Sequence, residues 1–128
     1  MLLLDTQLLL WGAMAPDRLS PDTLALVTSP EHPRAFSVVS VWEVVIKAGL
    51  RRDGFAVNPR RFRLGLLEGG FREFAVTSEH ALAVSRLPPL HKDPFDRLLL
   101  AQAEVEGATL LTADATLARY PGRIRLVA

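Results

Sequence analysis

The chain has 128 residues, of which 49% are hydrophobic and 23% are charged, so it can bury the core of a single domain over residues 1–128. The absence of cysteine excludes disulfides, zinc–thiolate sites, iron–sulfur clusters and thiol nucleophiles. Fifteen basic side chains nearly balance fourteen acidic ones, so a nucleic-acid partner would require a local basic patch. The Leu-rich start lacks the basic residues of a signal peptide, and no apolar run reaches ~18 residues, so we expect a cytoplasmic protein without a membrane segment.

Short apolar runs alternate with helical patterns in the first half of the chain. Leu2–Leu4 predicts a buried strand, and Thr6–Trp11 predicts a helix that ends near Gly12. The other elements expected here are a helix capped by Ser20 that runs to Ser29, a strand over Ala35–Val39, and a helix that begins at Ser40 and covers Val41–Leu50.

The second half continues the alternation after the basic segment Arg51–Gly70, which includes a helix from Asn58 to Leu67. The remaining expected elements are a strand over Glu73–Val76, a helix over Ser78–Ser85, a Pro-rich loop over Leu87–Lys92, a helix from Asp93 through Glu106 with Gly107 as its stop, a strand over Thr109–Thr112, a helical turn over Ala115–Arg119 and a strand over Ile124–Val127. Continuous apolar strands that alternate with helices predict an α/β fold with a mostly parallel central sheet flanked by helices.

Four separate segments place a carboxylate close to the end of a predicted strand or the start of a helix. Asp5 follows the first strand directly, and Asp114 follows Thr109–Thr112 closely. Glu43 and Asp96 are expected in the first turns of two helices, with no Lys or Arg in a matching position. Carboxylates gathered at one sheet edge repel each other unless a cation joins them, and oxygen ligands suit Mg²⁺ or Mn²⁺. This pattern predicts a metal-dependent phosphodiesterase site.

Helix capping is the alternative explanation for these acids. Glu43 lies three residues after Ser40, and Asp96 lies three residues after Asp93, which is the spacing of a capping box. The first and last acids could likewise cap the helices that follow them. We interpret Asp93 as a cap and Asp96 as functional, because a first-turn side chain is freer than a cap. Capping is favoured for each acid taken singly, whereas the four together favour a shared site.

Two further features bear on function. The basic segment Lys47–Arg63 is either a solvated face or a surface that follows a phosphate backbone. For His91, a hydrogen bond that orders its loop is favoured over contact with the acids. No nucleophile elbow, phosphate-binding loop or dinucleotide-binding glycine pattern is present. The candidate backbone-binding residues are Lys47, Arg51, Arg52, Arg60 and Arg61.

Four segments in a fixed order carry a family resemblance: Met1–Thr6 (MLLLDT), Ser40–Lys47 (SVWEVVIK), His91–Ala103 (HKDPFDRLLLAQA) and Leu111–Asp114 (LTAD). Together they resemble the PIN domain, and more narrowly the VapC-type toxins of bacterial toxin–antitoxin pairs. The resemblance implies a PIN-like three-layer domain and a Mg²⁺-dependent endoribonuclease that hydrolyses RNA through a metal-activated water. It also implies a small VapB-type antitoxin as partner and a homodimer.

Carried over by motif, the resemblance implies that Asp5, Glu43, Asp96 and Asp114 are both catalytic and metal-binding, with Mg²⁺ or Mn²⁺ as the ion. Thr112 matches a polar neighbour of the last acid, and the secondary candidates are Asp93 and Thr6.

Several rival functions stay open at this point. One is a catalytically silent interaction module of the same fold, and another is a DNA-directed nuclease. A phosphatase or a receiver-like phospho-acceptor is also conceivable. A receiver requires an acid beside Asp5 and a Lys near Ile124–Ala128, and the sequence has neither.

Overall fold

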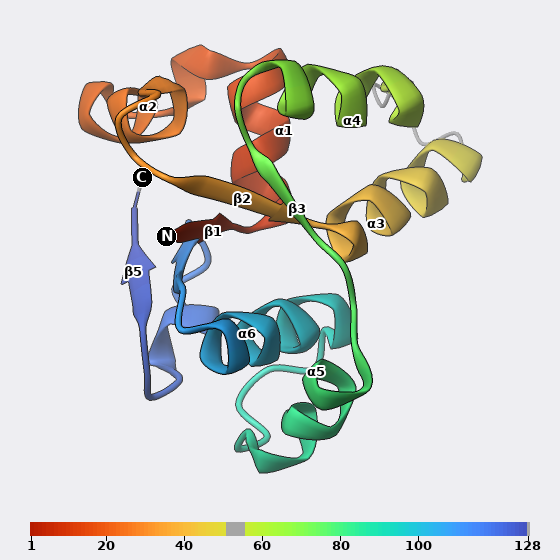
Figure 1. Cartoon of the computed structure of the whole chain (residues 1–128), viewed down its shortest axis with the longest axis vertical. Helices are drawn as coiled ribbons and strands as arrows, with labels where there is room; N and C mark the ends of the chain where they lie inside the picture. Colours follow the sequence, from red (N-terminus) through yellow and green to blue (C-terminus); the bar gives the residue numbers. More distant parts are fainter. Residues whose placement is uncertain (51–55, 128) are drawn as a thin grey trace.

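The computed structural model describes residues 1–50 and 56–127 (Figure 1). In this part of the chain five strands form one parallel sheet in the order β3-β2-β1-β4-β5. The strands are β1 (Leu2–Leu4), β2 (Arg34–Ser37), β3 (Arg72–Phe74), β4 (Thr109–Thr112) and β5 (Ile124–Leu126). The all-parallel sheet confirms the predicted fold class. Observed β3 lies slightly earlier than predicted, and β5 ends one residue sooner.

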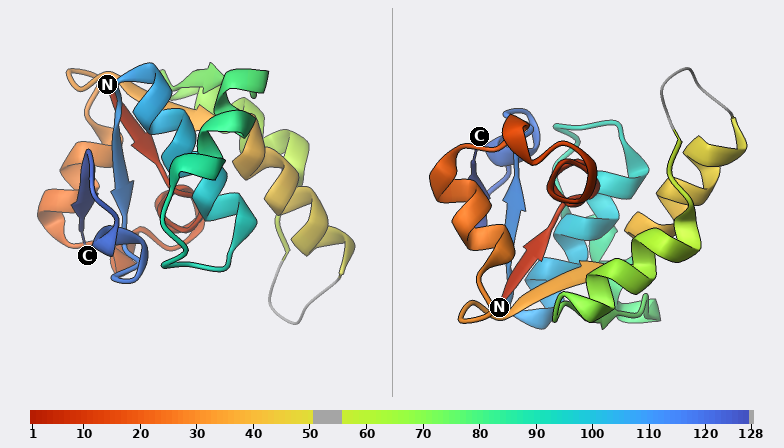
Figure 2. Two further views of the ribbon diagram at one scale, coloured as in Figure 1. Left: turned by 90° about the horizontal axis from the view of Figure 1, so that it is seen from below. Right: turned by 90° about the horizontal axis from the view of Figure 1, so that it is seen from above.

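Helices flank the sheet on both faces (Figures 1 and 2). They are α1 (Thr6–Met14), α2 (Pro21–Thr28), α3 (Val38–Gly49), α4 (Pro59–Glu68), α5 (Ser78–Ala83) and α6 (Pro94–Glu106), with short 3₁₀ turns η1 (Pro16–Arg18), η2 (Val84–Arg86) and η3 (Leu117–Arg119). None of the helices in the two described ranges is long and apolar enough to span a bilayer.

Alternation along the strands divides the core into two layers. In β1, Leu4 packs with α1, α2 and α4, whereas the neighbouring Leu3 packs with α6 on the opposite face. The same alternation separates Phe36 from Ala35 in β2 and Leu111 from Leu110 in β4. Burying both faces explains why the strands read as continuous apolar runs.

Helix α3 begins at Val38, two residues before the predicted start at Ser40. Ser37 is its N-cap and accepts a hydrogen bond from the backbone N–H of Val39 at 3.0 Å. The prediction of a strand through Val39 and a helix from Ser40 was therefore wrong. The β-branched pair Val38–Val39 favours a strand, but the Ser37 hydroxyl supplies a helix start before it.

Helix α1 continues past Gly12, where the sequence predicted its end. A Cβ atom at Gly12 would lie 3.1 Å from Cγ1 of Val27, so this glycine permits close packing of α1 on α2. The helix ends instead at Met14, and Ala15 is its non-helical C-cap, because a residue that precedes proline is disfavoured in the helical conformation.

Arg34 at the start of β2 is a buried cation, with 4% of its surface exposed. Its guanidinium donates to the carbonyl oxygens of Val27 and, at 2.7 Å, of Gly69, and it lies 4.3 Å from the centre of the Phe71 ring. These carbonyls belong to the C-terminal ends of α2 and α4, where helix dipoles are negative. Arg34 therefore ties two helices to the sheet.

The order of the strands reverses at β1. The chain runs from β1 to β2 and β3 on one side, then returns to place β4 and β5 on the other side. In parallel α/β sheets, ligands bind outside the carboxyl ends of the strands at such a reversal. The gap between the ends of β1 and β4 is therefore the expected place for a site.

Candidate active site

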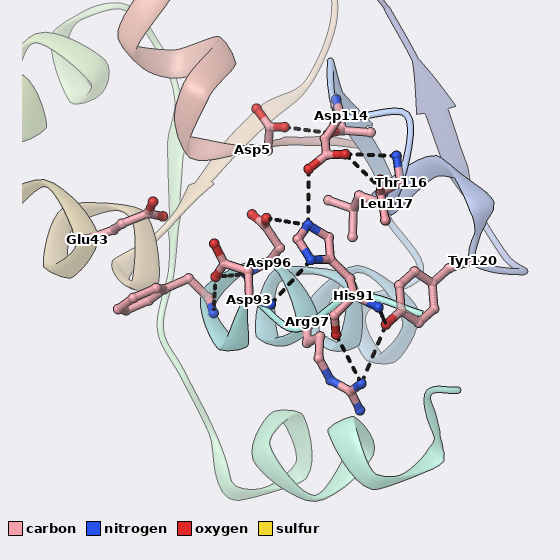
Figure 3. A network of polar contacts seen from close by, with 12 residues as sticks. Asp5, Glu43, His91, Asp93, Asp96, Arg97, Asp114, Thr116, Leu117 and Tyr120 are labelled. Atoms are coloured by element: carbon pink, nitrogen blue, oxygen red, sulfur yellow. Dashed lines mark hydrogen bonds and ion pairs between the residues drawn. The ribbon is translucent and has the colours of Figure 1, made fainter. Parts of the chain in front are cut away.

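A cavity of about 260 Å³ opens at the carboxyl ends of β1 and β4. All four predicted acids line it, although they come from four separate elements (Figure 3). The backbone amide of Asp5 donates to the carbonyl of Leu111 at 3.0 Å, which joins the two strand ends. The lining residues are Asp5, Thr6, Gln7, Trp11, Glu43, Lys47, Asp93, Asp96, Ala113 and Asp114.

Asp5 is the most buried of these acids, with 4% of its surface exposed. One carboxylate oxygen accepts the backbone N–H of Leu8 at 2.8 Å, so Asp5 caps α1. The other oxygen accepts the hydroxyl of Thr112 at 2.6 Å. Burial raises the pKa of Asp5, although both hydrogen bonds oppose the rise. Asp5 therefore caps α1 and lines the cavity at the same time.

Glu43 lies in the second turn of α3, because that helix begins at Val38. The capping box between Ser40 and Glu43, which was the alternative explanation for this acid, therefore does not form. Lys47, one turn further on, places its Nζ 3.2 Å from Oε2 of Glu43 and lines the same cavity. No Lys or Arg occupies a position that matches the acids, yet Lys47, a candidate backbone-binding residue, lies beside them. The second oxygen, Oε1, is buried and has no hydrogen-bond partner among the described residues.

Asp93 caps α6, as predicted. Its Oδ1 accepts the backbone N–H groups of Phe95 at 2.8 Å and of Asp96 at 3.3 Å. The carboxylate also lines the cavity, one turn of backbone away from Asp96. Asp93 thus adds negative charge to the site while it begins the helix that carries Asp96.

Asp96 has the most strongly shifted acidity in the site. Burial, followed by the charges of Asp93, Asp5 and Glu43, raises the pKa of Asp96 to about 7, against the opposing effect of His91. The raised pKa of Asp96 reflects its burial first and the negative charge of the neighbouring acids second.

Asp114 contacts a histidine that the sequence analysis did not place in the site. One oxygen of Asp114 accepts the backbone N–H groups of Thr116 and Leu117, and the other lies 3.0 Å from Nε2 of His91. Burial alone would raise the pKa of Asp114, but these hydrogen bonds lower it. The same Nε2 lies 3.2 Å from Oδ2 of Asp96. His91 therefore orders its loop and also contacts two acids.

The two predicted threonines connect the elements around the cavity. Thr112 donates to Asp5 and accepts the backbone N–H of Asp114 at 3.0 Å, so one hydroxyl orients both strand-end acids. Thr6 donates to the hydroxyl of Ser40 at 2.9 Å and joins α1 to α3.

The predicted basic residues separate into different places. Lys47 lines the acidic cavity, whereas Arg60 lines a cavity between α3 and α4, and Arg61 lines a cavity between α1, α2 and α4. Arg51 and Arg52 lie outside the described residues.

A family model described as the PIN domain matches residues 2–123. The chain belongs to the PIN domain family. The parallel sheet and the helical layers described above are thus the fold of a PIN domain. A search of curated protein sequences found no match to this PIN domain.

Solved structures with the same fold include toxin–antitoxin complexes. The chain is similar to VapBC2 from Rickettsia felis bound to a promoter DNA fragment, with a TM-score of 0.73 and 15% identity, covering 99% of this chain and 98% of that one. A toxin–antitoxin complex from Klebsiella pneumoniae matches with a TM-score of 0.67 and 18% identity over 98% and 96%. FitAcB from Neisseria gonorrhoeae matches with a TM-score of 0.61 and 20% identity over 91% and 90%.

The site of this PIN domain has the chemistry that a divalent cation requires. Carboxylate oxygens converge from four elements, and Oε1 of Glu43 is buried without a hydrogen-bond partner in the described part of the chain. Lys47 supplies one compensating charge against the surrounding acids. Hard oxygen donors in excess of nearby cations fit Mg²⁺ or Mn²⁺.

Proposed function

We propose that this PIN domain is a divalent-metal-dependent endoribonuclease and the toxin of a VapBC-type pair. The observation that carries the proposal is the cavity at the ends of β1 and β4, where four acids from separate elements surround an unpartnered carboxylate oxygen. Membership of the PIN domain family supports nuclease chemistry, and the resemblance to VapC-type sequences favours RNA as the substrate.

The residues that line or support the cavity have different roles in the proposed phosphodiester hydrolysis. Asp5, Glu43, Asp96 and Asp114 would hold Mg²⁺ or Mn²⁺, which when bound stabilises charge on a phosphate and makes a bound water a better nucleophile. Thr112 fixes the orientation of the acids at the two strand ends.

Lys47 gives the acidic cavity a local attraction for the negatively charged backbone of RNA. Its ammonium group is held toward the site by Glu43 and is about one third exposed. Lys47 therefore offers a positive charge to a phosphate that approaches the acids.

A VapB-type antitoxin is the partner that we propose. The similar solved structures from Rickettsia felis and Klebsiella pneumoniae are toxin–antitoxin complexes. Leu8 and Leu9 of α1 are buried in the core and do not form an exposed docking face, although Leu9 also lines a cavity beside α1. A largely apolar cavity of about 490 Å³ between α1, α2 and α4 offers an alternative surface.

We also propose a homodimer through α3. Val38, Trp42 and Val45 are 38%, 57% and 47% exposed, and their spacing places them on one side of the helix. An apolar stripe of this kind favours association with a second copy. Light scattering at several concentrations should show a dimer that Trp42→Ala weakens, and a monomeric wild type would contradict it.

The nuclease proposal is tested with protein purified free of any partner. We expect cleavage of RNA, in preference to a single-stranded DNA of the same sequence, when Mg²⁺ or Mn²⁺ is present. EDTA and Asp96→Asn should each abolish cleavage, while the exposed Asp17→Asn serves as the matched acidic control. Cleavage that survives both EDTA and Asp96→Asn would refute the proposal, and preferential cleavage of DNA would refute the substrate assignment.

A further inference from the structure

We propose that His91 is a positioning residue that holds Asp96 and Asp114 in place through an Nε2–H donor, and that it is not itself a metal ligand. The inference rests on the proposed function, since it concerns how the metal-holding carboxylates are oriented. Nε2 and one oxygen from each acid lie within 4.8 Å of one another, which would by itself suggest a three-ligand metal site. The hydrogen bonds around the imidazole ring of His91 argue against a metal site of this kind.

The other ring nitrogen of His91 fixes the tautomer. Nδ1 lies 3.2 Å from the backbone nitrogen of Asp93, and a backbone amide can only donate. Nδ1 must therefore carry the lone pair, which places the proton of the neutral ring on Nε2. That proton is donated to Oδ2 of Asp114, 3.0 Å from Nε2, and Oδ2 of Asp96 lies 3.2 Å from the same nitrogen.

A histidine that binds a metal through Nε2 has the opposite arrangement. It usually donates its other N–H to a carboxylate, a carbonyl or a water, and this fixes the metal-binding tautomer. Nδ1 of His91 faces a donor instead, so metal binding through Nε2 would bring two N–H groups into contact. Ligation would require the ring to leave its place beside Asp93.

The backbone around His91 is anchored from several sides (Figure 3). Its N–H donates to the hydroxyl of Tyr120 at 2.9 Å, and Tyr120 is 4% exposed. The guanidinium of Arg97 lies 3.5 Å from the carbonyl oxygens of His91 and Pro88 and from the Tyr120 hydroxyl. The segment from His91 to Arg97 thus holds its own loop, and this leaves the ring little freedom.

The donor joins acids that no secondary-structure element holds together. Asp96 belongs to the first turn of α6, and Asp114 belongs to the loop after β4. The N–H fixes one oxygen of Asp114 by a hydrogen bond, and its positive end lies close to one oxygen of Asp96, so it offsets the repulsion between the two carboxylates. The carboxylates are then already oriented when a cation arrives, which is the usual contribution of groups that support metal ligands.

Two spectroscopic measurements test the assignment of His91 without an assay of activity. Long-range ¹H–¹⁵N correlation spectra of the metal-free protein should show the Nε2–H tautomer for His91. Electron spin-echo spectra of the Mn²⁺-bound protein should show no coupling to a directly bound imidazole nitrogen. An Nδ1–H tautomer, or a coupling that disappears in His91→Gln, would overturn the inference.

Mn²⁺ titrations of three variants test the role of the donor. His91→Phe keeps a ring but removes the N–H, and we expect ~10–100-fold weaker Mn²⁺ binding, as for other residues that support ligands. His91→Gln places an amide N–H near the position of Nε2 and should restore most of the affinity. His32→Gln is the matched control, because His32 is exposed and is absent from the cavity lining.

The outcomes separate this inference from the proposed function. If wild-type protein binds no Mn²⁺, the metal-dependent nuclease proposal fails. If wild type and His91→Phe bind Mn²⁺ equally, the positioning role of His91 is wrong although the nuclease proposal stands. Circular dichroism checks that each variant is folded, and the tautomer measurement on wild type decides the assignment even if His91→Phe does not fold.

Discussion

Asp96 is the residue whose pKa is raised most clearly, by its burial and then by the charges of the neighbouring acids. Its pKa of about 7 means that the folded protein binds this proton more tightly than the unfolded chain, whose Asp carboxyls have a pKa of about 3.9. The stability due to this proton is fully present below pH ~3.9 and is lost as the pH rises to about 7. Asp96→Asn has no such proton to lose, and its amide still offers an oxygen to His91.

We therefore expect Asp96→Asn to unfold with a free energy ~1–3 kcal/mol larger than wild type at pH 8 in EDTA, since each pKa unit corresponds to ~1.4 kcal/mol before solvent screening. At pH 4 the two proteins should have nearly equal stability. Urea unfolding at both pH values measures the difference. A gap of the same size at pH 4 and pH 8 would contradict a raised pKa.

Lys47 offers a second prediction for a single residue. Removal of one backbone-contacting cation should reduce the salt dependence of single-stranded RNA binding by ~0.7 in the slope of log K against log salt. We expect this for Lys47→Gln, measured by fluorescence anisotropy in an Asp96→Asn background that does not cleave. Arg125→Gln, at an exposed arginine absent from the cavity lining, is the comparison. An unchanged slope in Lys47→Gln would exclude a direct contact with phosphate.

The positions of the acids could be predicted from the sequence, whereas the contacts of the residues beside them could not. Acids at strand ends were recognisable because parallel strands share one carboxyl edge. The i, i+4 spacing of Glu43 and Lys47 is a sequence pattern that is typical of an ion pair within one helix. His91 could not be placed, because its contact with Asp114 depends on the tertiary position of two loops.

The helices show why element boundaries are harder to predict than element types. Each expected helix exists, yet Gly12 lies inside α1 because its lack of a side chain serves packing on α2. The first residue of α3 is decided by which serine, Ser37 or Ser40, caps the helix. A local pattern allows either choice, and Ser40 is instead engaged with Thr6.

Arg34 provides a prediction for the association of elements. Arg34→Met would leave the carbonyls at the ends of α2 and α4 without their donor, and each unsatisfied buried group costs ~1–3 kcal/mol. We expect a loss of ~2–5 kcal/mol in the free energy of unfolding, measured in urea. The exposed Arg125→Met should change it by less than ~0.5 kcal/mol. Equal effects of the two changes would show that Arg34 does not tie these helices to the sheet.

At the scale of the whole molecule, a shared metal site predicts linkage between the ion and global stability. Mg²⁺ or Mn²⁺ at one hundred times its Kd should add ~2.7 kcal/mol, or on the order of 10 °C in Tm. Asp114→Asn, which keeps an oxygen for the backbone N–H groups of Thr116 and Leu117, should show a smaller increment. Thermal melts of both proteins, each with EDTA and with metal, measure this. Equal melting points in all four samples would mean that the acids do not share an ion.

The placement of β4 beside β1 also sets when the cavity can exist during synthesis. Asp5 receives its hydrogen bond from Thr112, 107 residues later in the chain. A ribosome that adds ~5–20 residues per second adds Thr112 ~5–20 s after Asp5. An emerging chain therefore has no complete acidic cavity until β4 has left the ribosome and paired with β1. The ribosome that makes the protein thus carries an inactive chain for nearly the whole of its translation.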